Sequence, residues 1–163
     1  MTGVGEIRRI IPHRYPILLV DRVSDVVPGE RLTAHKAVTA AEPCYELIED
    51  DAPPEAYAYP ISLLIESWAQ AAVLLVCWQR PNPNVLAGKV ELASGMRKVD
   101  LVEPVWPGDR LDHHVEIVRT VDDAAIIAGH STVEGRTVLR VGQFVAAMRD
   151  FEVLVRVPAT GGG

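Results

Sequence analysis

The residues with the clearest chemical potential lie in the longest apolar run of the chain, residues 61–78. Glu66 is the one charged residue of this run, and Ser62, Glu66 and Gln70 follow one another at intervals of four. On a helix this spacing places the three on one face, as a narrow polar row on an apolar cylinder. A carboxyl group in such surroundings is a candidate for proton transfer. The alternative is a buried Glu66 that only accepts hydrogen bonds from backbone groups.

Proton abstraction next to a carbonyl group also needs a base, and histidine is the commonest choice. His113 and His114 are neighbours on an expected strand, so they should point to opposite faces and cannot chelate together. His13 lies in the rigid segment 11–16, where we interpret it as a turn residue in preference to a catalyst. None of the histidines and cysteines has the spacing of a metal site, so we expect neither a metal nor another cofactor. The other residues of these two types are His35, His130, Cys44 and Cys77.

The composition limits the class of protein. The chain has 163 residues, of which 48% are hydrophobic and 23% are charged, as in ordinary globular domains. We therefore expect one domain over residues 6–155, with flexible ends at 1–5 and 156–163. The formal net charge of −6 argues against nucleic-acid binding. Glu66 within the apolar run favours a buried core helix over a membrane span, and the use of only two cysteines fits a cytoplasmic protein.

A long helix and an antiparallel sheet are the elements expected to position Glu66. The apolar run predicts a helix over residues 61–78 that is buried on all sides. The loop 40–60 before it is acidic and rich in proline, and loops of this length inside a domain are often functional. The remaining segments have strand-like patterns separated by turn residues, which favours an α+β fold with the sheet wrapped around the helix. The expected strands are residues 17–27, 31–39, 85–93, 96–103, 110–121, 124–133 and 137–148.

Three motifs follow one another along the chain. Residues 11–23 are IPHRYPILLVDRV, residues 64–72 are LIESWAQAA, and residues 104–111 are PVWPGDRL. Over about residues 7–150 the chain resembles the bacterial 3-hydroxyacyl-[acyl-carrier-protein] dehydratases of fatty-acid synthesis. The resemblance implies a hot-dog fold and a dimer in which two sheets join edge to edge. It also implies substrates that are carried as thioesters on the phosphopantetheine arm of an acyl carrier protein.

The site of this family pairs a histidine of one protomer with a glutamate on the central helix of the other. The glutamate corresponds to Glu66, which the resemblance therefore implies is catalytic, and Gln70 also matches. The family's glycine at the start of the helix is replaced by Ile61. We expect Ile61, Ser62 and Gln70 to contribute to substrate binding.

The family's catalytic histidine has no counterpart in this sequence, because no histidine lies between residues 46 and 59. We therefore expect a homodimer to be weak or inactive. In a mixed dimer with a histidine-bearing dehydratase subunit, Glu66 would complete one working site. The alternatives are a self-sufficient hot-dog enzyme, either a thioesterase or a dehydratase, and a non-catalytic module that binds acyl chains or a carrier protein. An acidic carrier protein would need a basic patch, for which Arg97 and Lys98 are candidates.

Overall fold

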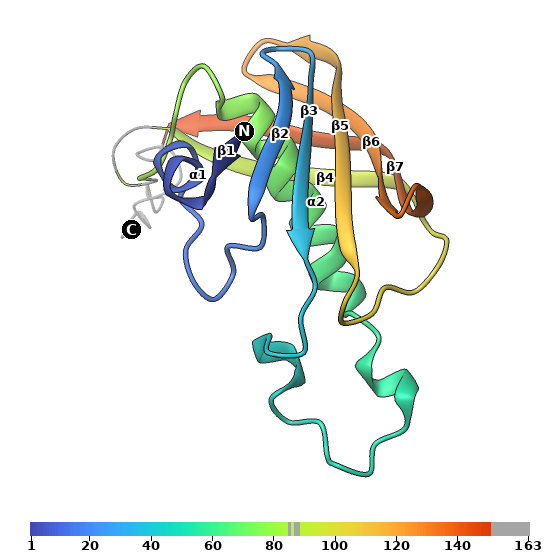
Figure 1. Cartoon of the computed structure of the whole chain (residues 1–163). Coiled ribbons are helices and arrows are strands. Elements are labelled where there is room, and N and C mark those ends of the chain that lie inside the picture. The colour runs from blue at the N-terminus through green and yellow to red at the C-terminus, as the bar shows by residue number, and fades with distance from the viewer. Residues whose placement is uncertain (85, 87–88, 151–163) are drawn as a thin grey trace, which may run out of the picture.

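The computed structural model describes residues 1–84, 86 and 89–150. Within them, seven antiparallel strands form one sheet in the order β1-β2-β3-β5-β6-β7-β4, and the sheet curves around the helix α2 (Figure 1). This arrangement confirms the α+β fold expected from the sequence. The strands are β1 (Thr2–Gly3), β2 (Arg22–Val27), β3 (Arg31–Ala37), β4 (Lys89–Leu101), β5 (Arg110–Val121), β6 (Ala124–Val133) and β7 (Arg136–Asp150). The helices are α1 (Val4–Ile10), α2 (Ile61–Cys77) and two short 3-10 helices, Pro43–Tyr45 and Pro54–Tyr57.

The helix α2 fills the concave side of the sheet because its apolar residues surround it on most sides. Trp68 and Leu74 have no exposed surface, and the Trp68 ring packs edge-on against Phe144 of β7 at 5.9 Å between ring centroids. By length and composition the segment Pro54–Cys77 could cross a membrane, but half of its apolar window is buried inside the fold. The expected core helix over residues 61–78 is therefore confirmed, one residue shorter at its end. The expectation that it is buried on all sides is wrong, because the sheet covers only one side of it and Ile61, Ala69 and Val73 remain partly or largely exposed.

Several boundaries differ from the sequence-based expectation. Residues 1–5, expected to be flexible, contain β1 and the start of α1, because β1 pairs with β2 and Ile7 of α1 is fully buried. The strand predicted over 17–27 begins only at Arg22, since the preceding residues bond to α2. The strands predicted over 85–93 and 96–103 are one strand, β4, with an irregularity between Ala93 and Gly95. The expected flexible end at 156–163 lies outside the described residues.

The loop between β3 and α2 extends away from the body of the domain (Figure 1). Its base is nevertheless firmly held. Lys36 is only 4% exposed, and its Nζ lies 3.0 Å from Oε1 of Glu42, while the backbone N–H of Tyr59 donates to the Val105 carbonyl at 2.7 Å. Lys36 also lies over the Tyr59 ring, 5.3 Å from its centroid. Both ends of the loop are therefore held against the body of the domain.

His113 and His114 point to opposite faces of β5, as expected. His113 faces α2 with no exposed surface, and its Nδ1 lies 2.8 Å from the Ser131 hydroxyl. Burial, with a smaller contribution from the charge of Lys36, lowers the pKa of His113 to about 3. His114 lies on the outer face and stacks on His130 with ring centroids 4.8 Å apart. The two adjacent imidazoles therefore lie in different environments.

We predict that His113 makes the fold sensitive to acid. Its folded-state pKa lies below that of the unfolded chain, so below about pH 6.5 the unfolded state binds the extra proton and stability falls as the pH falls. Between pH 7 and pH 5 this one residue should remove about 2 kcal/mol from the free energy of unfolding. Urea denaturation of the wild type and of His113→Gln measures the effect, with His130→Gln as the exposed control. A wild type and a His113→Gln variant with the same pH dependence would contradict this account.

Candidate active site

The side chain of Gln70 connects the segment before β2 to the central helix. Its Oε1 accepts the backbone N–H of Leu19 at 2.9 Å. Its Nε2 donates to the carbonyl of Ile17 at 2.6 Å and to Oε1 of Glu66 at 2.7 Å. Because the N–H of Leu19 needs an acceptor, the amide can have only one orientation, and its nitrogen must face Glu66. Gln70 is 1% exposed, and its bond to the Leu19 N–H is buried.

His13 lies beside Glu66 in the same chain. Its Nε2 is 3.6 Å from Oε1 of Glu66, and its Nδ1 is buried without a hydrogen-bond partner within the described residues. Burial lowers the pKa of His13, while the charge of Glu66 opposes this shift and that of Arg14 adds to it. The side chain of Arg14 holds the turn by donating to the carbonyls of Ile11, His13 and Arg8. Hydrogen bonds from Arg14 thus fix the backbone that carries the His13 imidazole.

Glu66, Gln70 and His13 line one cavity of about 130 Å³. Its apolar walls come from α2, from β4 through Ala93 and from β7 through Phe144. A carboxyl and an imidazole therefore meet at the same small space, which is the arrangement needed for proton transfer to and from a bound molecule.

Glu66 also lies on the side of α2 that the sheet does not cover. Its side chain is 35% exposed, and the neighbouring α2 residues Ile65, Ala69 and Val73 are only partly buried. Beside this face runs β4, which forms one edge of the sheet and pairs only with β7 among the described strands. An apolar helix face beside an unpaired strand edge is a surface that a second chain can cover.

The other predicted site residues lie apart from this cavity. Ile61 is 55% exposed and lines a different cavity, with Tyr59 and Val105, while Ser62 is exposed and lines neither. Arg97 and Lys98 are exposed on the edge strand β4. Of the residues expected to bind substrate, the structure brings only Gln70 to Glu66.

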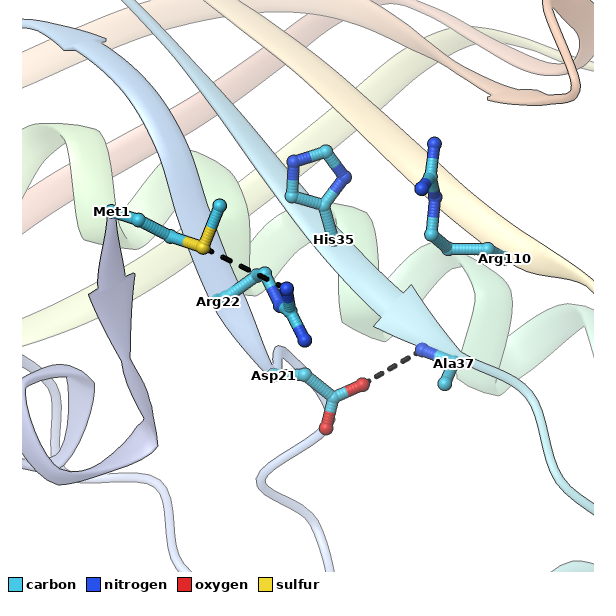
Figure 2. Close-up of a pocket in the computed structure, with 6 residues that line it drawn as sticks. All are labelled: Met1, Asp21, Arg22, His35, Ala37 and Arg110. Atoms are coloured by element: carbon cyan, nitrogen blue, oxygen red, sulfur yellow. Dashed lines mark hydrogen bonds between the residues drawn. The ribbon is translucent and has the colours of Figure 1, made fainter.

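The larger cavity of about 410 Å³ lies on the other side of the sheet (Figure 2). His35 points into it and alternates along β3 with the buried residues Ala34 and Lys36, which face the helix. Two of its residues share the carboxylate of Asp112, which accepts hydrogen bonds from Arg110 at 2.9 and 3.0 Å and lies 2.6 Å from the ring of His35. This cavity is separated from Glu66 by the sheet and plays no part in its chemistry.

Comparison with known proteins places this arrangement in a family. The pattern of the FabA-like domain matches residues 11–142, which include both His13 and Glu66. The chain belongs to the FabA-like family. It is 37% identical over 148 residues to the 3-hydroxyacyl-[acyl-carrier-protein] dehydratase FabZ of Oleidesulfovibrio alaskensis, covering 91% of this chain and 92% of that protein. It is also 37% identical over 147 residues to FabZ of Myxococcus xanthus, with coverages of 90% and 92%.

Solved structures confirm the hot-dog fold of this FabA-like chain. The dehydratase heterocomplex ApeI:P from Xenorhabdus doucetiae matches with a TM-score of 0.74 at 17% identity, covering 92% of this chain and 95% of that chain. A hot-dog-like protein from Thermanaerovibrio acidaminovorans matches with a TM-score of 0.58 at 15% identity, covering 78% and 86%. At these identities the likeness concerns the fold alone.

The contact between His13 and Glu66 is the feature of the site that sequence analysis missed. The sequence motif predicts a turn residue that bonds the backbone. The turn is present, but Nδ1 of His13 has no hydrogen-bond partner in the part of the chain that the structure describes, and Nε2 faces Glu66. The signal available in the sequence was the motif at residues 11–16 itself, which carries an imidazole just before the residues that bond to Gln70.

We predict that Gln70→Met destabilises the FabA-like domain. The substitution keeps the length of the side chain but removes partners from the Leu19 N–H and the Ile17 carbonyl, which should cost about 3 kcal/mol. Urea denaturation measures the loss, and Gln79→Met, at an exposed position, is the matched control. Equal unfolding free energies for the two variants would show that the hydrogen bonds of Gln70 contribute nothing to stability.

Proposed function

We propose that this chain is a subunit of a dehydratase that acts on 3-hydroxyacyl thioesters carried on an acyl carrier protein in fatty-acid or polyketide biosynthesis. The observation that carries the proposal is Glu66, held by Gln70 at the edge of a small cavity and open toward the side that a second chain would cover. The FabZ relatives support the same reaction, since their names specify 3-hydroxyacyl-[acyl-carrier-protein] dehydratases.

In this proposal Glu66 is the general acid. A base removes the proton from the carbon next to the thioester carbonyl, and the electron pair of that C–H bond forms the new double bond. The β-carbon to oxygen bond breaks while Glu66 donates a proton to the departing hydroxyl, which leaves as water. The cycle closes when the proton taken up by the base is released and Glu66 regains one, so atoms and charge balance without a metal, a redox partner or a cofactor of the protein.

The base, we propose, comes from a histidine-bearing dehydratase subunit in a mixed dimer. Residues 46–59 belong to the loop that projects from the domain (Figure 1), and they contain no histidine that could act as the base. The half-buried face around Glu66 and the edge strand β4 offer the surface on which such a partner would pack. The likeness in fold to a chain of a dehydratase heterocomplex supports a mixed assembly. Such a dimer would hold one working site, to which this chain lends Glu66.

We also propose a contact surface for the carrier protein and a location for the complex. The exposed residues Arg97 and Lys98 lie on the same strand as Ala93 of the cavity wall, and we propose that they contact the acidic carrier protein. At the start of α2, Ile61 would reach the substrate only through the neighbouring cavity, which Ser62 does not line. We propose that the complex works in the cytoplasm, with substrates delivered on phosphopantetheine.

A second candidate is a self-sufficient dehydratase. The specific observation in its favour is His13, whose Nε2 lies 3.6 Å from Glu66 in the same chain and faces the same cavity. In that arrangement a homodimer would contain both an acid and an imidazole base. The two candidates differ in one measurable property, because only the second allows the purified homodimer to dehydrate a 3-hydroxyacyl thioester at a rate comparable with that of the mixed dimer.

We predict that Glu66→Gln abolishes dehydration by the mixed dimer. The amide keeps the shape of the carboxyl but has no acid proton to donate, so the rate should fall by about 100-fold or more. The measurement is the conversion of 3-hydroxyacyl thioester to enoyl thioester by the complex of this chain with a histidine-bearing FabZ-like subunit. Glu116→Gln, at an exposed position on β5, is the control of equal charge. Full activity of Glu66→Gln would refute the proposed function.

A further inference from the structure

Two nitrogen atoms approach the same oxygen of Glu66. Nε2 of Gln70 donates to Oε1 at 2.7 Å, and Nε2 of His13 lies 3.6 Å from that oxygen. The second distance is too long for a hydrogen bond. Contacts in active sites often have such lengths before substrate binds and shorten when the site closes. The imidazole is thus one small movement from becoming a second partner of Oε1.

The surroundings of His13 indicate which nitrogen carries its proton. Nδ1 is buried and has no hydrogen-bond partner within the described residues, whereas Nε2 faces the carboxyl group. A proton on Nε2 presents an N–H to the oxygen, while a proton on Nδ1 would leave lone pairs facing each other. The charged or titratable groups near the ring are Glu66 and Cys77 from α2 and Arg14 from its own segment. The cavity residues of β4 and β7, Ala93 and Phe144, carry no charge.

We propose that His13 is a positioning residue for Glu66, which together with Gln70 occupies Oε1 and so leaves the acid proton on Oε2, the oxygen available to substrate. This inference rests on the proposed function, because it concerns Glu66 as the general acid. His13 acts through Glu66 in this proposal, and the base remains a separate group. Without His13, the carboxyl group would sample orientations in which its proton faces away from the departing hydroxyl.

The backbone around His13 is built for such a role. Arg14 donates to the carbonyls of Ile11 and of His13 itself, at 2.9 and 2.7 Å, and the N–H of Asn82 donates to the carbonyl of Ile10 at 2.8 Å. Gln70 fixes the same segment a few residues later, at Ile17. The backbone that carries the imidazole therefore cannot shift away from Glu66 without breaking several hydrogen bonds, and a fixed backbone is what a positioning group requires.

The test compares His13→Phe with His13→Gln in the complex that shows dehydratase activity. Phe keeps a ring but has no N–H, so kcat should fall about 10- to 100-fold with little change in KM. Gln places an amide N–H at a similar distance from the backbone and should keep kcat within a few-fold of the wild type. Urea denaturation of both variants separates positioning from folding. His130→Phe, an exposed histidine on the outer face, is the control.

The results that would overturn the positioning role differ from those that bear on the proposed function. Wild-type kcat in His13→Phe, or equal losses in the Phe and Gln variants at equal stability, would overturn the positioning role. Those outcomes leave the proposed function intact, which only an active Glu66→Gln complex refutes.

Discussion

The amide of Gln70 is the interaction on which the candidate site depends. One buried side chain satisfies the N–H of Leu19 and the carbonyl of Ile17 and still has an N–H left for Glu66. Because the backbone partners determine the orientation of the amide, the carboxyl group of Glu66 faces the NH₂ group of Gln70 and never its oxygen. The same bonds bring the turn with His13 against α2. Fold stability and site geometry are therefore two results of one set of hydrogen bonds.

The second constraint is that the sheet encloses α2 on only part of its circumference. Trp68 and Leu74 are buried under the sheet, whereas Ala69 and Val73 are only partly covered. The uncovered stripe runs beside β4, a 13-residue strand at the edge of the sheet. An apolar stripe and a strand edge that no described strand pairs with are both unfavourable in water, and one partner that packs here would cover both. Glu66 lies in this stripe, so the proposed chemistry and the proposed assembly use the same surface.

The sequence predicted those parts of the molecule that local patterns determine. The apolar run gave the limits of α2 to within one residue, and the strands over 110–121 and 124–133 were predicted with their observed ends. The spacing of four between Glu66 and Gln70 predicted their contact, because neighbours on a helix face meet. The place of His13 could not be predicted in this way. Its distance to Glu66 depends on bonds between residues about fifty positions apart, and no local periodicity encodes them.

In the proposed mixed dimer two imidazoles would lie near Glu66, and they would not be redundant because the two roles need different positions. A base must reach the proton on the carbon next to the thioester carbonyl, which requires access to the substrate from the open side of the site. His13 instead lies with Nε2 toward Oε1, the oxygen already held by Gln70, and it is fixed there by the turn that Arg14 holds. A group on a fixed backbone beside the acid is well placed to orient it and poorly placed to follow a moving substrate. The proposed mixed dimer meets this requirement, since its base would come from across the uncovered face, from a partner whose packing would also bury the stripe around Glu66.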